Sequence, residues 1–292
     1  MNKTENGLLE YIKGKYSPTS VNSHYGNTLR YLACIGARAL TANYQDILNY
    51  IETLRTQELH PKTLRNYLYA VKIYYNYLQE SGQRQDHPCK RLYLKDRINR
   101  AIPMETLYSE RQLEELMNNY QSLDPELQQR NMVIISLLVY QALNIREISN
   151  LQMQDIDLEK GQIFVRASVQ LNARTLPLKP NQIMMFYNYI TGYRKRARKC
   201  PERKTGHFIV SSQGNKLTDY AIRYVLKNRS TPAGNFTAIK IRQSVIAHLL
   251  KRNDVRVVQV FAGHRRSSAT EAYQQSGIEE LKKDIMKVHP LR

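Results

Sequence analysis

The chain has 292 residues, which is enough for two domains that each bury a hydrophobic core. Its 44 lysines and arginines outnumber its 25 aspartates and glutamates, which gives a formal net charge of +19. So large an excess favours a polyanionic partner, with nucleic acid ahead of an anionic membrane surface.

Other features argue against a membrane protein and against a disulfide or zinc scaffold. No apolar run approaches the ~20 residues that span a bilayer, and the first residues lack the apolar core of a signal peptide. The three cysteines, Cys34, Cys89 and Cys200, are scattered and show no CxxC spacing. We therefore expect free thiols, no metal site and a reducing, cytoplasmic location.

Residues 1 to about 85 predict helices only. The clearest helix starts at Pro61 and ends at Gly82, because proline suits a first turn and glycine an end. Its apolar positions step by four and three residues and so form one stripe: Leu64, Leu68, Val71, Tyr75 and Leu78. Thr41 is expected to cap a helix around 47–54, and two more helices are expected at about 5–15 and 18–35. The pattern predicts a bundle of four short helices with basic outer faces.

The periodicity disappears between residues 86 and 108, which contain two prolines and many charges and are expected to form a basic linker. Helical patterning resumes at Ser109, an expected N-cap with Gln112 at the capping-box position. The almost wholly apolar run 133–143 predicts a buried helix.

Residues 161–178 are the strand region. Ile163, Val165, Ala167 and Val169 alternate with polar residues, which is typical of a half-buried strand. Asn172 is expected in a turn before a second strand that closes at 175–177, and the chain after it is expected to be helical, with a short amphipathic helix at 278–287. The fold class is therefore predicted as mainly α with a small β-hairpin, in two domains.

Three residues of the last third, taken in order, indicate phosphodiester chemistry. Arg242 offers a bidentate guanidinium for phosphate oxygens, His264 an imidazole that stabilises a phosphoryl transition state, and Tyr273 a phenol that can attack phosphorus. Each residue alone is more often structural, since the chain has 21 tyrosines. A solvated basic face and a capping histidine are the plain alternatives for the first two.

Arg146 is a further phosphate-binding candidate. Asn144 tolerates the left-handed conformation that ends a helix, so Arg146 is expected to open a new helix, whose N-terminus favours phosphate. The alternative is an ordinary salt bridge to Glu147 or Asp155. Lys240, two residues before Arg242, could reach the same phosphate.

Together these segments resemble a known family. The signature residues are His248-Leu249-Leu250, Asp254, Arg256-Val257-Val258-Gln259, Gly263-His264, Thr270 and Tyr273. They resemble the signature of the tyrosine site-specific recombinases, the phage-integrase and Xer-like group. Residues 145–157 resemble the first arginine box of that family, and 174–178 the end of its active-site hairpin. The resemblance implies a helical core-DNA-binding domain (SAM-like) at 1–85, a linker at 86–108 and a catalytic domain at 109–292, with a docking segment from about 276.

The resemblance implies a DNA breaking-and-rejoining enzyme that needs no metal and no other cofactor. Tyr273 would attack a scissile phosphate of duplex DNA and form a 3′-phosphotyrosine. Arg146 and Arg242 would hold the non-bridging oxygens, and His264 would stabilise the pentacovalent state. Four protomers on two DNA sites would exchange strands in pairs, with integration, excision, inversion or resolution as the outcome. Accessory DNA-bending proteins are further partners that the sequence leaves open.

Two departures from the family pattern affect catalysis. The hairpin normally carries a lysine that protonates the leaving 5′-oxygen, and counting along the hairpin gives Gln170 or Ser168 instead. Lys240, Arg166 and Lys179 are the candidate substitutes. The histidine expected three residues before Arg242 is replaced by Ile239.

Two other functions compete with an active recombinase. A DNA-binding regulator could retain the recombinase fold after losing catalysis, for which Gln170 and Ile239 are the best arguments. A monomeric DNA-relaxing enzyme of the type IB topoisomerase class would not need a docking segment. Trapping of a covalent DNA adduct separates the first two.

Overall fold

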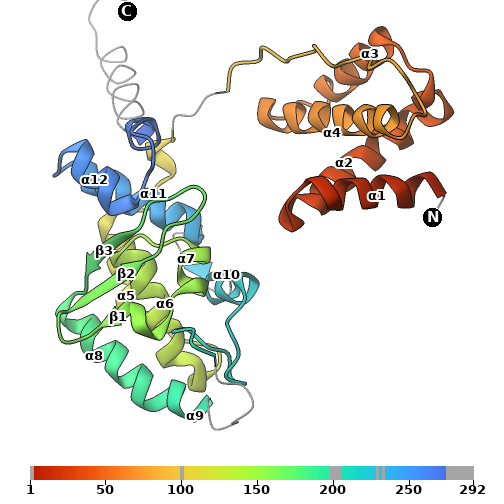
Figure 1. Ribbon diagram of the computed structural model, residues 1–292. Coiled ribbons are helices and arrows are strands. Elements are labelled where there is room, and N and C mark those ends of the chain that lie inside the picture. Colours follow the sequence, from red (N-terminus) through yellow and green to blue (C-terminus); the bar gives the residue numbers. More distant parts are fainter. Residues whose placement is uncertain (1–2, 99–101, 198–204, 228–229, 232–233, 274–292) are drawn as a thin grey trace, which may run out of the picture. The chain divides into compact units, whose positions relative to one another are not determined.

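The computed structural model describes residues 3–98, 102–197, 205–227, 230–231 and 234–273 (Figure 1). The chain divides into two compact units, Met1–Asn99 and Arg100–Arg292. Helices dominate both, with one three-stranded antiparallel sheet and one two-stranded sheet in the second. The expected fold class, mainly α with a small β region, is confirmed.

Within residues 3–98, which the structure describes, the first unit contains four helices, as expected. They are α1 (Lys3–Lys15), α2 (Pro18–Ile35), α3 (Tyr44–Arg55) and α4 (Pro61–Glu80), with a short 3-10 turn at Gly36–Leu40. The cap of α3 was placed wrongly at Thr41. Asn43 caps this helix instead, because it directly precedes the first helical residue and exchanges hydrogen bonds with Asp46 in a capping box.

Helix α4 provides the largest share of the core of the first unit. Its expected apolar stripe is buried along its whole length: Leu64, Leu68, Val71, Tyr75 and Leu78. The Tyr75 hydroxyl hydrogen-bonds to the hydroxyl of Tyr31, and it donates to the Ala39 carbonyl at 3.0 Å. The helix starts at Pro61 and is followed by Gly82 at φ +69°, so both of its predicted ends are confirmed.

Residues 86–98, most of the segment expected to be a linker, lie against the first unit. Cys89 is buried, and the Lys72 ammonium rests 4.0 Å from the ring centroid of Tyr93. Asp96 accepts a 2.9 Å hydrogen bond from Arg55. Residues 99–101 lie outside the described ranges, and Tyr108, past them, is buried in the second unit.

The second unit is built around one buried helix. Its helices are α5 (Glu110–Asn118), α6 (Gln128–Tyr140), α7 (Ile145–Asn150), α8 (Pro180–Tyr189), α9 (Lys195–Ala197), α10 (Asp219–Lys227), α11 (Ala238–Leu250) and α12 (Val255–Ala262). Single turns occur at Met104–Thr106, Pro125–Leu127, Met153–Asp155 and Ile190–Arg194, and a last helical segment covers 268–273. The apolar run of α6 is buried all round, as a helix without a polar face must be. The expected capping box of Ser109 and Gln112 begins α5.

The three-stranded sheet has the order β1 (Ile156–Asp157), β2 (Gln162–Val165), β3 (Arg174–Pro177). Ile163 pairs with Leu176, and Val165 pairs with Arg174. These four side chains are buried, so one face of the β2–β3 hairpin faces the core.

The predicted alternation extended too far along this hairpin. Strand β2 ends at Val165, so Ala167 and Val169 lie in the connecting loop, and Val169 is 90% exposed. The loop closes on itself through a 2.8 Å bond from the Ser168 N–H to the Leu171 carbonyl. Alternation alone does not make a strand where the backbone has no ladder partner.

The expectation of helices alone after residue 178 was also wrong. A β-bridge joins Val210 to Lys216, and two short strands follow, β4 (Ser230–Thr231) and β5 (Gly234–Asn235). The helix expected at 278–287 and the docking segment from about 276 lie outside the described residues.

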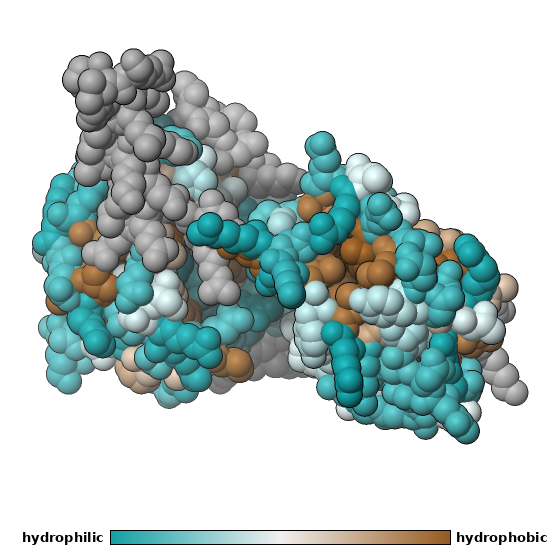
Figure 2. All heavy atoms as spheres, turned by 90° about the horizontal axis from the view of Figure 1, so that it is seen from above, coloured by the Kyte–Doolittle hydropathy of each residue, from teal (hydrophilic) through white to brown (hydrophobic). Residues whose placement is uncertain are grey.

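Figure 2 shows hydrophilic side chains over much of the visible surface of both units, which accords with the basic composition. Among the helices in the described ranges, none has the length and apolar character needed to cross a membrane.

Candidate active site

Arg242 lies on α11, five residues after the N-cap Thr237, and its side chain is only 12% exposed. Its guanidinium donates to the carbonyl of Ala142 and, at 2.6 Å, to the carbonyl of Ala262. The Nη1 atom is also 3.6 Å from an oxygen of Glu147. Burial lowers the pKa of this arginine, and the Glu147 carboxylate opposes that shift. The guanidinium is thus fixed between the end of α6 and the end of α12.

Glu147 is the centre of a charged cluster that it forms with Arg174 and Arg242. It is 8% exposed and accepts a 2.7 Å bond from Nη1 of Arg174 through one oxygen. Its other oxygen faces Arg242 and accepts the Asn144 N–H at 2.9 Å. One buried carboxylate therefore holds two guanidiniums and closes the capping box of α7.

The backbone before α7 differs from the expectation. Asn144 has φ −84° and ψ 166°, so it is an extended N-cap residue and not a left-handed helix end. The positive φ, +50°, belongs to Ala142. A left-handed alanine is strained, and here its carbonyl accepts the bond from Arg242.

Arg174 begins β3 and its side chain is 2% exposed. A Cβ on Gly263 would lie 2.5 Å from Nη1 of this arginine, so a side chain there would force the guanidinium to shift. Gly263 also has φ +71° and ends α12, as predicted. Sequence reasoning treated Arg174 only as the end of a hairpin. The usable signal was parity, because Arg174 and the core residue Leu176 are two apart and share one face of the strand.

His264 follows Gly263, and its Nδ1 lies 2.8 Å from the hydroxyl of Thr270. Its backbone N–H donates to the Gln259 carbonyl at 3.0 Å. Burial, then the charges of Arg242 and Arg174, lower the pKa of the imidazole to about 4. His264 is therefore neutral at neutral pH and can accept a proton.

Tyr273 lies on the helical segment 268–273 and is 9% exposed, packed in the core of the second unit. Burial raises the pKa of its phenol, and the positive charge of Arg242 opposes the rise. The phenol is protonated at neutral pH, so a nucleophilic role needs a base or a shift of the segment.

The structure does not bring Arg146 into this cluster. Its side chain is 72% exposed, and its Nε lies 3.8 Å from an oxygen of Asp219. The reason is local: consecutive helical residues point about 100° apart, so an inward Glu147 turns Arg146 outward. Glu147, which was considered as a salt-bridge partner of Arg146, pairs with Arg174 and Arg242 instead.

Comparison with known proteins identifies the family. The model of the phage integrase family matches residues 107–280. The chain belongs to the phage integrase family of tyrosine site-specific recombinases, which are DNA breaking-and-rejoining enzymes. The chain is 27% identical over 294 residues to tyrosine recombinase XerC of Oceanobacillus iheyensis, covering 97% of this chain and 94% of that one. It is 26% identical over 275 residues to tyrosine recombinase XerA of Pyrococcus furiosus, covering 91% and 89%.

Solved structures show the same fold. The XerH recombinase bound to its difH substrate before cleavage superposes with a TM-score of 0.70 at 18% identity, covering 96% of this chain and 84% of that one. The Tn1549 integrase bound to transposon right-end DNA gives a TM-score of 0.62 at 16% identity, covering 96% and 98%.

None of the three residues considered as substitutes for the hairpin lysine bonds to this recombinase's charged cluster in the described structure. The Lys240 ammonium lies 4.4 Å from the ring centroid of Tyr108, and residues two apart on a helix point in different directions. Arg166 donates to Asp155 at 2.8–3.1 Å. Lys179 follows the far end of β3, roughly 16 Å along the chain from Arg174 at ~3.3 Å per residue.

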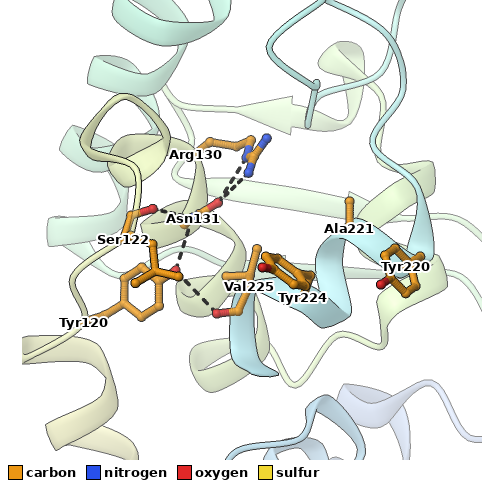
Figure 3. A pocket seen from close by; sticks show the side chains of 9 residues that line it. Tyr120, Ser122, Arg130, Asn131, Tyr220, Ala221, Tyr224 and Val225 are labelled. Atoms are coloured by element: carbon orange, nitrogen blue, oxygen red, sulfur yellow. Dashed lines mark hydrogen bonds between the residues drawn. The ribbon is translucent and has the colours of Figure 1, made fainter. Parts of the chain in front are cut away.

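A cavity of about 260 Å³ in the second unit is lined by other residues (Figure 3). Asn131 donates to the hydroxyls of Tyr120 and Ser122 at 3.1 and 3.0 Å, and its carbonyl accepts from Arg130. The polar atoms of this amide are thus occupied within the protein, and the cavity contains none of the residues of the charged cluster. Within the described ranges, no three His, Cys, Asp or Glu side chains gather in a way that could hold a metal ion.

Proposed function

We propose that Tyr273, Arg242 and His264 are the catalytic residues with which this recombinase cuts and rejoins DNA. The observation that carries the proposal is that α11 meets the stretch of chain from Ala262 to Tyr273. Arg242 of α11 binds the Ala262 carbonyl, which directly precedes Gly263-His264, and its charge acts on the phenol of Tyr273. A guanidinium, a neutral imidazole and a phenol thereby share one partly dry site.

In the proposed reaction the Tyr273 oxygen attacks the scissile phosphorus. The new bond is a phosphotyrosine ester to the 3′ side of the DNA, and the bond to the 5′-oxygen breaks. The phenolic proton needs an acceptor, which neutral His264 can be. Arg242 has five N–H donors, so its two carbonyl bonds leave donors for a non-bridging oxygen. The ester keeps the energy of the original bond, so rejoining reverses the same step.

A nicked suicide duplex, from which the short 5′ fragment diffuses away, tests this proposal. Wild-type protein should accumulate a denaturant-resistant DNA adduct. Tyr273→Phe should bind the duplex with unchanged affinity and form no adduct, because only the nucleophilic oxygen is lost. Tyr220→Phe is the matched control, since Tyr220 is 75% exposed, and it should react like wild type. An adduct with Tyr273→Phe would refute the assignment, and duplex binding without any wild-type adduct would favour the regulator.

The leaving 5′-oxygen also needs a proton, and for this step we propose Lys240. Its ammonium would have to leave the ring of Tyr108, which a flexible four-carbon side chain allows. Lys240→Ala should slow cleavage about 10²-fold or more. A substrate with a 5′-bridging sulfur should restore the rate, because a thiolate leaves without protonation. Equal loss on both substrates would exclude proton donation by Lys240.

The phosphate-binding role expected for Arg146 stays a prediction, since its exposed side chain would have to leave Asp219.

We further propose that four protomers act on two duplex sites in the cytoplasm, with accessory DNA-bending proteins as optional partners. The relatives seen bound to DNA are similar recombinases, which supports the duplex as substrate. Light scattering of the protein on a two-site DNA should give the mass of four chains, and a monomer on each site would refute the tetramer.

A further inference from the structure

We propose that Arg174 is a second phosphate-binding residue of this site, a deeper assignment that rests on the proposed function. The observation behind it is a buried guanidinium with unused donors. Nη1 of Arg174 donates to Glu147 at 2.7 Å, whereas its Nε and Nη2 are buried and have no hydrogen-bond partner among the residues that the structure describes. A buried donor left unpaired loses its hydration without compensation, so a charged group with two of them calls for a ligand.

The two unused donors form one edge of the guanidinium. The N–H bonds of Nε and Nη2 run parallel on the side away from Nη1, and this edge binds two oxygens of a phosphate or carboxylate at once. Glu147 already occupies the other end of the group. The carboxylate therefore holds Arg174 with its two-pronged edge free.

The position of this arginine matches the site of the proposed reaction. Gly263 leaves room for Nη1 directly before His264, and Arg174 shares the Glu147 carboxylate with Arg242. Two guanidiniums and one carboxylate leave one uncompensated positive charge beside a neutral imidazole. A phosphodiester carries one negative charge and would balance it.

Arg146 offers a contrasting environment. Its side chain is 72% exposed and faces Asp219. Arg174 on β3, and not Arg146 on α7, supplies the second guanidinium at Glu147. Because Arg174 and Tyr273 are both buried, the site must open before a phosphate reaches them. Loss of Arg174 should therefore slow the chemical step more than it weakens duplex binding.

The test compares two suicide duplexes, one with the natural phosphodiester and one with a neutral methylphosphonate at the scissile position. Arg174→Ala should lower the rate of adduct formation about 10²–10³-fold on the phosphodiester, as removal of an oxyanion donor does. It should regain most of that loss on the methylphosphonate, which has less negative charge to balance, while the duplex Kd changes less than about threefold. Arg174→Lys keeps a charge beside Glu147, so the same pattern from a folded Lys variant excludes simple unfolding. Arg111→Ala, at an exposed arginine paired with Glu115, is the matched control.

Equal loss on both substrates would overturn the proposal, and so would rescue of Arg146→Ala by the methylphosphonate with no effect of Arg174→Ala. A second readout does not depend on cleavage. In Tyr273→Phe protein, the Nε–H resonance of Arg174 should shift when the phosphodiester duplex is added and shift less with the methylphosphonate. An unmoved resonance would refute the phosphate contact even if Tyr273 is the nucleophile. A shifted resonance without any wild-type adduct would instead retain the contact and refute the catalytic function.

Discussion

Two neighbouring residues of α7 have opposite surroundings. Glu147 is buried and binds Arg174 at 2.7 Å, whereas Arg146 is exposed and lies 3.8 Å from Asp219. Both are arginine–carboxylate pairs, yet burial changes how much each pair contributes to stability. The exposed pair contributes about 0–1 kcal/mol. The buried group costs several kcal/mol if one partner is removed, because a charge is then left in the interior. Burial, and not residue type, therefore distinguishes the arginine that is held at the candidate site from the one that is not.

Neutralising the shared carboxylate should change stability the most. Glu147→Gln leaves Arg174 and Arg242 without a counter-charge, so the free energy of unfolding in urea should fall by about 3–5 kcal/mol. Asp219→Asn, at the exposed pair, should cost less than about 1 kcal/mol. Equal losses would show that the buried cluster is not energetically distinct.

A pair of glycines tests the packing around Arg174. Gly263 and Gly82 both have φ near +70°, at +71° and +69°, so alanine strains both by about 1–2 kcal/mol. Only at Gly263 would the new Cβ meet Arg174, whereas nothing lies within 4 Å at Gly82. Thermal melts should show Gly263→Ala less stable than Gly82→Ala by about 1 kcal/mol or more, and its adduct formation should be slower. Equal melting and normal cleavage would contradict the contact.

His264 gives the charged cluster a pH dependence. Its pKa of about 4 lies below the ~6.5 of an unfolded histidine, so the unfolded chain binds more protons between these values. Its contribution to stability is therefore present above about pH 6.5 and is lost as the pH falls toward 4. After allowance for solvent screening we expect a loss on the order of 1–2 kcal/mol. Urea titrations of wild type and His264→Asn isolate this difference from the other histidines, and parallel pH curves would contradict it.

Two of the capping boxes of the second unit, those at Ser109 and Asn144, give the smallest and most selective effect. Asn144→Ala and Ser109→Ala each remove an N-cap and should cost about 1 kcal/mol in stability. Only Asn144→Ala loosens the helix turn that carries Glu147, so only this variant should also cleave the suicide duplex more slowly. Equal cleavage rates for the two variants would show that the Asn144 cap does not affect the candidate site.

The parts of the fold that were predictable from sequence depend on neighbours along the chain. The helix from Pro61 to the glycine at position 82 and the capping box at Ser109 were predicted because prolines, glycines and caps act within one turn. Val169 was misplaced because a strand needs a partner strand, which alternation does not supply. Short strands such as β4 and β5 carry too few residues to show a period.

The site was predictable where it lies on one stretch of sequence and not where it is assembled from several. Gly263, His264 and Tyr273 lie within eleven residues, and the resemblance found them together. Arg174 could not be recognised in this way, because its role depends on which strand face meets Glu147, a residue 27 positions earlier. The same tertiary contact decides that Arg146 faces outward.

In the proposed reaction, DNA becomes joined to Tyr273 beside this buried cluster. The most direct measurement is trypsin digestion of the adduct trapped on the suicide duplex, followed by mass spectrometry of the DNA-linked peptide. Cleavage after Arg266 and Lys282 gives the peptide 267–282, in which Tyr273 is the single tyrosine. The nucleotide mass should be attached to this peptide at Tyr273. Attachment to a peptide from any other part of the chain would contradict it.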